Sequence, residues 1–269
     1  MTKAPIRVGI GGWTYDPWKG SFYPEKWPVK RELEYASRHV TAIEVNGTYY
    51  SGFKPATFVN WAKTAPDGFV FTLKASRYCT NRKVLAEGGE SIQRFVAQGI
   101  VELGEKLGPI LWQFMGTKKF EPDDFAAFLA LLPAKHDGVA LRHAVHVRHD
   151  SFAVPAFIAM CRKAGVTIVY ADSTDYPAIA DVTGDFVYAR LEDAVEEEPA
   201  GYAPAALDRW THAAQRWAAG GTPDGLPYVG APPAKTPRET FVFFINGFKE
   251  RAPAGAMSLI KRLADPSKT

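Results

Sequence analysis

Eight short apolar runs recur along the chain, and segments with helical periodicity separate several of them. The runs lie at residues 6–12, 41–46, 69–74, 109–114, 144–149, 166–172, 185–191 and 241–246. Their length and their β-branched and aromatic content are typical of buried strands. Apolar residues between 92 and 107, and again between 125 and 132, recur at helical spacing.

Two more helices are predicted near the end of the chain, at residues 204–221 and 252–264. The first begins with a proline suited to a first turn and ends in two glycines. Alternation of strand and helix through eight strands predicts a parallel sheet closed into a (β/α)₈ TIM barrel. A doubly wound open sheet is less favoured, because GIGGWTYDPW lacks the full G-x-G-x-x-G pattern.

One barrel domain accounts for the whole chain, residues 1–269, because α/β barrels of about 250 residues fold as a unit. One long connection departs from the alternation of strands and helices, a Pro/Gly-rich insert at 220–239. Loops of this length are usually functional or disordered. We expect the insert to lie beside the barrel mouth as a lid or rim loop.

The stretch AIEVN at 42–46 places Glu44 between Ile43 and Val45. Strand side chains alternate between faces, so if these two apolar residues meet the helices, Glu44 points into the barrel. The same alternation, applied to every strand, predicts further inward residues: Gly9, Gly11, Trp13, Ala42, Asn46, Thr72, Lys74, Gln113, His146, Arg148, Tyr170, Asp172, Tyr188, Arg190 and Asn246.

The inward polar residues concentrate at the C-terminal ends of the strands, which is where TIM-barrel enzymes build their active sites. We therefore expect a functional site there. The alternative for any single pair, such as Glu44–Lys74 or Asp172–Arg148, is a structural ion pair inside the barrel.

Composition sets only broad limits on function. The formal net charge is +3 and no Lys/Arg run exceeds two residues, so a nucleic-acid partner is neither required nor excluded. No apolar run approaches a membrane span, and the N-terminus lacks a signal-peptide pattern. Cys79 and Cys161 lie far apart, which favours reduced thiols. We expect a cytoplasmic protein with no membrane partner.

Several stretches resemble the domain of unknown function 72 family, the YecE-like proteins. The matching stretches are GGWTYDPWKGSFYPEKW, EVNGTYY, DGFVFTLKASR, LGPILWQF, VRHDSF, DFVYARL and RAPAGAM. They follow the family's order over roughly residues 6–264. The resemblance implies a TIM barrel and the face that carries the site, but it supplies no reaction.

Two positions depart from the pattern that this resemblance implies. His146 stands where the family typically has a glutamate, and Ile245 with Asn246 stands where it tends to have paired asparagines. The 220–239 insert also looks longer than the usual connection. Substrate or activity is therefore expected to differ from that of typical members.

The inward set predicts an anionic ligand. Lys74, Arg148 and Arg190 outnumber Glu44 and Asp172, and arginine suits bidentate recognition of phosphate or carboxylate groups. Loop aromatics such as Trp13 could stack on sugars or bases. Alternatively, they pack over the barrel mouth without contacting a ligand. The predicted ligand-binding residues are Trp13, Tyr15, Asn46, Tyr49, Gln113, Arg148, His149, Arg190 and Asn246.

The predicted catalytic residues are Glu44, Lys74, His146 and Asp172. Either carboxylate could serve as a base, and His146 as acid or base. Lys74 could instead form a Schiff base if the neighbouring arginines lowered its pKa, a less favoured role.

A divalent-metal site is the main rival. Glu44, His146, His149 and Asp172 could supply its ligands. Three cations in the same mouth would repel a metal ion, so we favour a site without metal or other cofactor.

The favoured function is an enzyme that performs acid–base chemistry on a small anionic substrate, phosphorylated or sugar-like, at the C-terminal face. Two alternatives stay open. One is a nucleic-acid-processing barrel of endonuclease type, and the other is a barrel that binds a ligand without catalysis.

Overall fold

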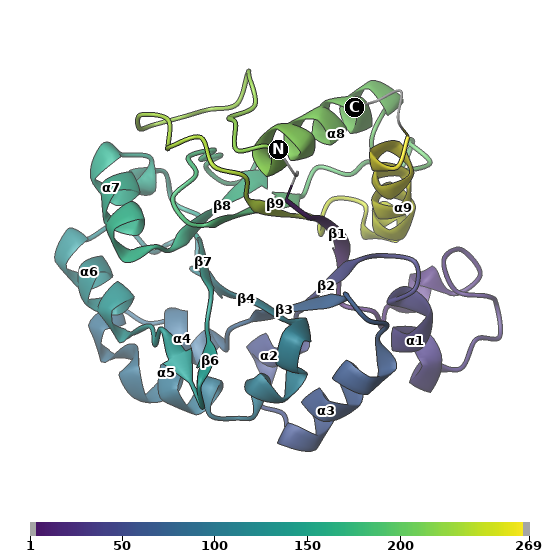
Figure 1. Cartoon of the computed structure of the whole chain (residues 1–269), viewed down its shortest axis with the longest axis horizontal. Coiled ribbons are helices and arrows are strands. Elements are labelled where there is room, and N and C mark those ends of the chain that lie inside the picture. The colour runs from purple at the N-terminus through teal and green to yellow at the C-terminus, as the bar shows by residue number, and fades with distance from the viewer. Residues whose placement is uncertain (1–3, 266–269) are drawn as a thin grey trace.

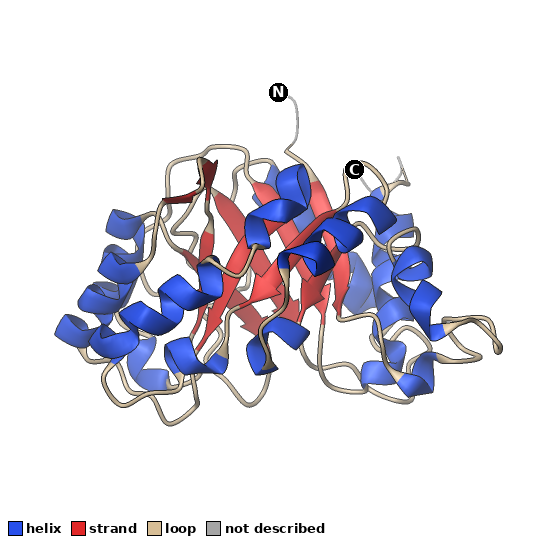
Figure 2. Ribbon diagram, turned by 90° about the horizontal axis from the view of Figure 1, so that it is seen from below, coloured by secondary structure: helices blue, strands red, loops and turns tan. Residues whose placement is uncertain are grey.

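A closed barrel of eight parallel strands forms the centre of the protein in a computed structural model that describes residues 4–265. Figure 1 shows the barrel end-on with helices around it, and Figure 2 shows it from the side. Its strands are β1 (Ile6–Gly11), β2 (Ala42–Val45), β3 (Val70–Lys74), β4 (Leu107–Gln113), β7 (His143–His146), β8 (Thr167–Asp172), β9 (Phe186–Leu191) and β10 (Glu239–Phe244). Each predicted run overlaps one of these strands, and the TIM-barrel prediction is confirmed.

Helices connect most of the strands on the outside of the barrel. They are α1 (Glu32–Ala36), α2 (Gly47–Tyr50), α3 (Pro55–Thr64), α4 (Arg77–Thr80), α5 (Gly89–Val96), α6 (Pro122–Leu131), α7 (Pro155–Ala164), α8 (Pro204–Ala218) and α9 (Ala252–Leu263). Several begin with proline, whose missing N–H is not needed in a first turn. A small hairpin of β5 (Lys135–His136) and β6 (Val139–Ala140) precedes β7.

Two connections differ from a regular helix. The periodic segment at 92–107 is broken, since α5 ends at Val96 and a 3₁₀ helix follows at Ile100–Lys106. Between β8 and β9, residues 173–185 contain no helix. Ile179 and Val182 of this segment are nevertheless buried in the core.

The Pro/Gly-rich insert joins the end of α8 to the start of β10, and its residues 223–226 share a hollow with Asp172, the last residue of β8. Its predicted role as a lid or rim loop stays a prediction. The insert runs beside α8, between that helix and α7 (Figure 1). Ala180 N donates to Pro227 O at 2.9 Å, so the insert packs on the helix-free segment. It covers the side of the barrel that lacks a helix.

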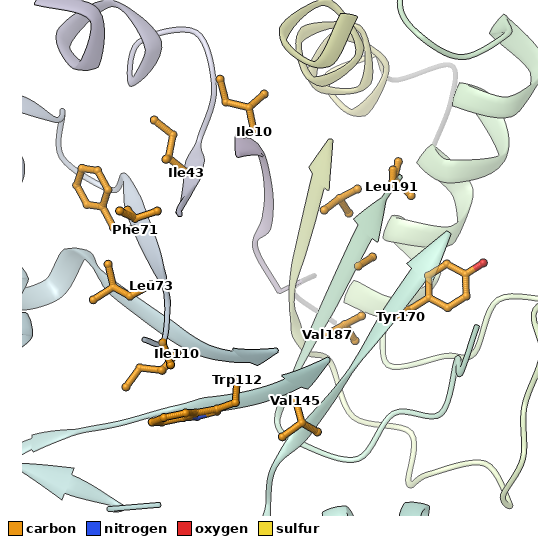
Figure 3. Packing of buried hydrophobic residues seen from close by; sticks show 14 of the residues in the cluster. Ile10, Ile43, Phe71, Leu73, Ile110, Trp112, Val145, Tyr170, Val187 and Leu191 are labelled. Carbon is orange, nitrogen blue, oxygen red and sulfur yellow. The ribbon is translucent and has the colours of Figure 1, made fainter. Parts of the chain in front are cut away.

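The barrel strands present two apolar layers. Figure 3 shows residues such as Ile43, Phe71 and Leu73 pointing away from the barrel interior. The inner layer consists of Ala42, Val70, Leu111, Ala144, Val169, Phe186, Tyr188, Phe241, Phe243 and Ile245. A Cβ on Gly9 would lie 2.8 Å from the Phe243 ring and 2.2 Å from Ala42 O, so glycine there makes room for the aromatic filling. Glu44 comes two residues after Ala42 of the inner layer, so its predicted direction into the barrel agrees with these two layers.

The predicted inward direction is wrong on β8. Tyr170 packs against Trp210 and Trp217 of α8, at ring-centroid distances of 5.8 and 6.0 Å, and points outward in Figure 3. Asp172, two residues on, lines a hollow beside α8 instead of the barrel interior. Both faces of this strand are apolar, so the sequence pattern could not distinguish them.

Two other inward predictions are also wrong. On β10 the inner residues are Phe241, Phe243 and Ile245, which leaves Asn246 exposed. Trp13 packs edge-on against Trp61 of α3, at 5.1 Å, and against outward-facing Phe71. Gly12, with a φ of +74°, precedes Trp13 and ends the strand alternation.

Asp181 is expected to hold the insert in place. Its carboxylate is buried and accepts hydrogen bonds from Val229 N at 2.7 Å and Gly230 N at 2.8 Å. Asp181→Asn should lower the free energy of unfolding by about 1.5–3 kcal/mol, since hydrogen bonds to a charged group are lost. Urea unfolding measures this, with Asp224→Asn, an exposed position in the same insert, as the control. Equal stability of both variants would show that the insert is not anchored through Asp181.

Candidate functional site

Arg190 of β9 occupies the centre of the barrel near the C-terminal ends of the strands. Its guanidinium donates to both oxygens of Glu44, from Nε to Oε2 and from Nη2 to Oε1, each at 3.1 Å. Glu44 is fully buried and also accepts a hydrogen bond from Tyr188 Oη at 2.8 Å. The buried carboxylate is therefore paired in the bidentate geometry that arginine and carboxylate favour.

A second carboxylate completes the environment of Arg190. Arg190 Nη1 donates to Glu192 Oε1, and the Glu192 side chain is also buried. Burial alone would lower the pKa of Arg190, but Glu44 and Glu192 outweigh it and raise that pKa above its ordinary value. Arg190 is thus a permanent cation between two carboxylates.

Glu192 was missed by the sequence analysis. It lies directly after β9, two residues beyond Arg190, so continuing the alternation of inward residues by one step would have identified it. The contacts define a central cluster, used below in this sense: Glu44, Lys74, Gln113, His146, Arg148, Arg190 and Glu192.

His146 of β7 is held in one protonation state. Its Nδ1 lies 3.0 Å from Arg190 Nη1, and since a guanidinium N–H can only donate, Nδ1 is the acceptor. Burial lowers the pKa of His146 well below its ordinary value, and the cations Arg190, Arg148 and Lys74 lower it further. The imidazole is therefore neutral, with its proton on Nε2.

Lys74 and Arg148 are each covered by a tyrosine ring. Lys74 Nζ lies 4.4 Å from the centre of the Tyr49 ring, and the Arg148 guanidinium carbon lies 4.1 Å from that of Tyr176. Burial, and then the charge of Arg190, lowers the pKa of both side chains, that of Lys74 to about 8. Tyr176, from the loop after β8, is a second member of the site that the sequence analysis missed.

Three buried polar atoms of the central cluster have no hydrogen-bond partner within residues 4–265. They are His146 Nε2, Arg148 Nε and Glu192 Oε2. Buried polar atoms are normally paired, because an unpaired one loses its hydration without compensation. Two free donors and one free acceptor in the same cluster mark a place where a polar ligand could bind.

A charged network at the opposite end of the barrel provides a contrast. Glu239 accepts from Arg7 Nε at 2.9 Å and from Arg142 Nη1 at 2.6 Å. Among the described residues, no buried side-chain atom of Arg7, Arg142 or Glu239 lacks a hydrogen-bond partner. It is a satisfied structural network, unlike the central cluster.

The other predicted site residues lie around the cluster or away from it. Asn46 and Trp13 line a hollow of about 280 Å³ next to β1 and β2, together with Phe53, Trp61 and Lys249. Tyr15 donates to Glu250 at 3.2 Å, which ties the loop after β1 to the loop after β10.

The side chains of His149 and Asp172 make no hydrogen bond or ion pair with the side chains of the central cluster. Asp172 contacts the cluster through its backbone carbonyl, which accepts a hydrogen bond from Glu192 N at 2.9 Å. His149 Nδ1 accepts a hydrogen bond from Ser151 N at 3.1 Å and caps a short 3₁₀ helix. Asp172 lies outside, where burial and then the charge of Asp193 raise its pKa to about 6. In the described part of the chain, no three His, Cys, Asp or Glu side chains form a group that could hold a metal ion. The four residues suggested as metal ligands are therefore not assembled.

Larger hollows exist elsewhere on the protein. One of about 820 Å³ lies between Asp172, α8 and residues 223–226, and one of about 650 Å³ lies at the N-terminal ends of β7 and β9. Volume alone does not identify a site, which needs convergent polar groups as well. The unpaired atoms favour the central cluster over these hollows.

Comparison with protein families identifies the chain. Residues 7–269 match the family described as "Protein of unknown function DUF72". The chain belongs to the DUF72 family. This confirms the resemblance found in the sequence and agrees with the barrel fold.

Solved structures of two DUF72 family proteins are similar to this chain. That from Thermotoga maritima is 23% identical, with a TM-score of 0.72, covering 97% of this chain and 100% of its own. That from Enterococcus faecalis is 18% identical, with a TM-score of 0.68, covering 97% and 98%. A structure titled SacUVDE is 10% identical, with a TM-score of 0.56, covering 98% and 100%. At these identities the likenesses establish the fold alone.

A search of curated proteins returned no match. Within residues 4–265, no helix has the length and apolar character needed to cross a membrane. The two positions that are expected to depart from the family pattern have different surroundings. His146 lies in the central cluster, and Ile245 lies in the apolar inner layer.

Glu44→Gln should strongly destabilise this DUF72 protein. The change leaves Arg190 buried with one of its two carboxylates gone, and removing one partner of a buried ion pair costs about 3–5 kcal/mol. Urea unfolding measures the loss. Glu90→Gln serves as the control, since the Arg94–Glu90 pair is exposed and should contribute nothing measurable. A Glu44→Gln variant as stable as the control would show that Glu44 does not hold Arg190.

Proposed function

We propose that this protein is an enzyme that uses acid–base chemistry on a small anionic substrate, bound at the C-terminal mouth of the barrel by the central cluster. The observation that carries the proposal is the set of three unpaired atoms, His146 Nε2, Arg148 Nε and Glu192 Oε2. A cluster built only for stability would have its polar atoms paired.

The charges of the cluster support an anionic ligand. Glu44 and Glu192 both pair with Arg190, which leaves Lys74 and Arg148 without a carboxylate partner among the described residues. Burial, and then the charge of Arg190, lowers the pKa of both cations, and a bound anion would counter the charge of Arg190. A phosphate or carboxylate group would provide this negative charge, and arginine binds such groups well.

Each free atom has a chemical role in this proposal. Arg148 Nε–H and His146 Nε2–H donate hydrogen bonds to oxygens of the substrate. Glu192 Oε2 is the free acceptor and serves as the general base, because a base must have an accessible lone pair. Glu44, with both oxygens bound, positions Arg190 and takes no proton itself.

The uncharged part of the substrate would occupy the hollow lined by Trp13, Asn46 and Trp61. Aromatic faces beside an amide suit a sugar-like group. Asp172, His149 and Asn246 have no catalytic or binding role in this proposal: the Asp172 side chain lines a separate hollow beside α8, His149 caps a short 3₁₀ helix, and Asn246 is exposed.

Entry of a substrate requires movement of a tyrosine. Lys74 is 8% exposed beneath Tyr49, and Arg148 is half-buried beneath Tyr176. Each such cation–π contact contributes about 0.5–2 kcal/mol of stability. The free energy of ligand binding can offset the loss of one of them. We expect Tyr176, on a helix-free loop, to move more readily than Tyr49, which lies in α2.

A second candidate function is nucleic-acid processing. Tyr50 and Tyr78, in short helices that follow β2 and β3, are 64% and 62% exposed, and Arg77 lies 5.4 Å from the Tyr78 ring. Exposed aromatics next to arginine suit stacking on single-stranded bases. Binding of an oligonucleotide that weakens steeply with salt and is lost in Tyr50→Ala would favour this function.

Inorganic phosphate is the simplest probe of the proposed site. Phosphate should raise the melting temperature by mass action. Arg148→Gln should weaken phosphate binding by about 10- to 100-fold, as expected when a charged hydrogen bond worth about 1.5–3 kcal/mol is lost. Glu192→Gln should tighten it instead, since a negative charge is removed. Calorimetric titration measures both changes.

The opposite signs of these two changes distinguish the proposal from general destabilisation. Arg94→Gln, an exposed position on α5, should bind phosphate as the wild type does. Equal phosphate affinity in all four proteins would refute the site. Once a phosphorylated or carboxylated metabolite is found by thermal-shift screening, Glu192→Gln should bind it without turning it over. Turnover at the wild-type rate would refute the assigned base.

A further inference from the structure

Lys74 is buried in the central cluster without the partner that a structural lysine normally has. It is the last residue of β3 and is 8% exposed. Among the described residues its ammonium makes no hydrogen bond or ion pair, and its defined contact is with the face of the Tyr49 ring. Buried lysines that serve stability are usually paired with carboxylates.

The obvious partner is already occupied. Both oxygens of Glu44 bind Arg190, and Tyr188 takes a further position on Oε2. Glu192 Oε1 also binds Arg190, which leaves Glu192 Oε2 as the free carboxylate oxygen of the cluster. The arrangement thus keeps the Lys74 amine free while placing a proton acceptor in the same cluster.

Two arginines act on the same amine. Burial, and then the charges of Arg190 and Arg148, lower the pKa of Lys74 to about 8, although Glu44 and Glu192 act in the opposite direction. A lysine in this state has a useful fraction of neutral amine near neutral pH, which is the nucleophilic form.

We propose that Lys74 is a nucleophile that forms a Schiff base with the carbonyl carbon of a small anionic aldehyde or ketone held by Arg148. The inference rests on the proposed function and specifies its substrate class, since it requires a carbonyl group next to the phosphate or carboxylate. Lys74, Arg148 and Glu192 then have separate roles as nucleophile, anion anchor and proton carrier.

The protons and electron pairs of this step balance within the cluster. Glu192 Oε2 takes one proton from the Lys74 ammonium, and the amine lone pair forms the C–N bond while the C=O π pair moves to oxygen. Glu192 then carries protons from nitrogen to that oxygen. The C–O bond breaks, water leaves with two of the three ammonium protons, and the nitrogen lone pair forms C=N⁺ with the third proton retained. Glu192 ends as the carboxylate.

Reductive trapping tests the inference on the intact protein. Wild-type protein is incubated with sodium cyanoborohydride and glyceraldehyde 3-phosphate or pyruvate, and the adducts are located by peptide mass mapping. We expect one dominant adduct, at Lys74, formed at least tenfold faster than with the uncharged analogues glyceraldehyde and hydroxyacetone. Its rate should rise with pH through an inflection near 8.

Matched variants define the site. Lys74→Arg should abolish the adduct, and Arg148→Gln should remove the preference for the charged carbonyl compounds. Lys119→Arg, at an exposed position, should leave the Lys74 adduct unchanged. Lys74 labelled no faster than Lys119 in the wild type, or equal rates with charged and uncharged carbonyls, would overturn the inference.

Phosphate binding separates this inference from the proposed function. Wild-type protein that binds phosphate but gives no Lys74 adduct with any of the probes would overturn the Schiff-base inference and leave the anion site standing. Absence of phosphate binding would overturn both.

Discussion

The pairing of Arg190 with Glu44 inside the barrel is the interaction on which the rest of the site depends. Each charge would be strongly destabilising alone in the protein interior, and together they are stable through two hydrogen bonds in bidentate geometry. The remaining guanidinium nitrogen then determines the state of its neighbours. It fixes the His146 tautomer and binds one oxygen of Glu192. Two of the three unpaired atoms of the cluster, His146 Nε2 and Glu192 Oε2, therefore follow from where Arg190 lies.

The same arginine explains why two cations of the cluster have no carboxylate partner among the described residues. Because it uses both nearby carboxylates, Lys74 and Arg148 are left with aromatic faces as their partners. In the network of Glu239, Arg7 and Arg142 at the other end of the barrel, by contrast, the partly exposed charges are paired with one another. Unpaired buried atoms gathered in one cluster near the C-terminal ends of the strands are expected of a barrel with its site at that face.

Much of the fold and about half of the site geometry could be predicted from the sequence. Strand alternation placed Glu44, Lys74, His146 and Arg190 correctly, because one face of each of these strands is clearly apolar. It failed for Tyr170 and Asn246, on strands that are apolar on both faces, where only packing against α8 or Phe243 decides the direction. It also could not show that Glu44 pairs with Arg190 rather than Lys74, since pairing depends on distances across the barrel. Tyr176 carried no signal, because its loop has no regular alternation.

The central claim is that the cluster is a ligand site with a free imidazole N–H, and the state of His146 tests it most directly. Long-range ¹H–¹⁵N correlation spectra, assigned with a His146→Gln variant, report which ring nitrogen carries the proton. We predict a neutral ring protonated at Nε2 at pH 7, with the Nε2 resonance shifting as phosphate is titrated. A ring protonated at Nδ1, or a His146 signal that stays unchanged at phosphate concentrations that saturate the thermal shift, would contradict the account.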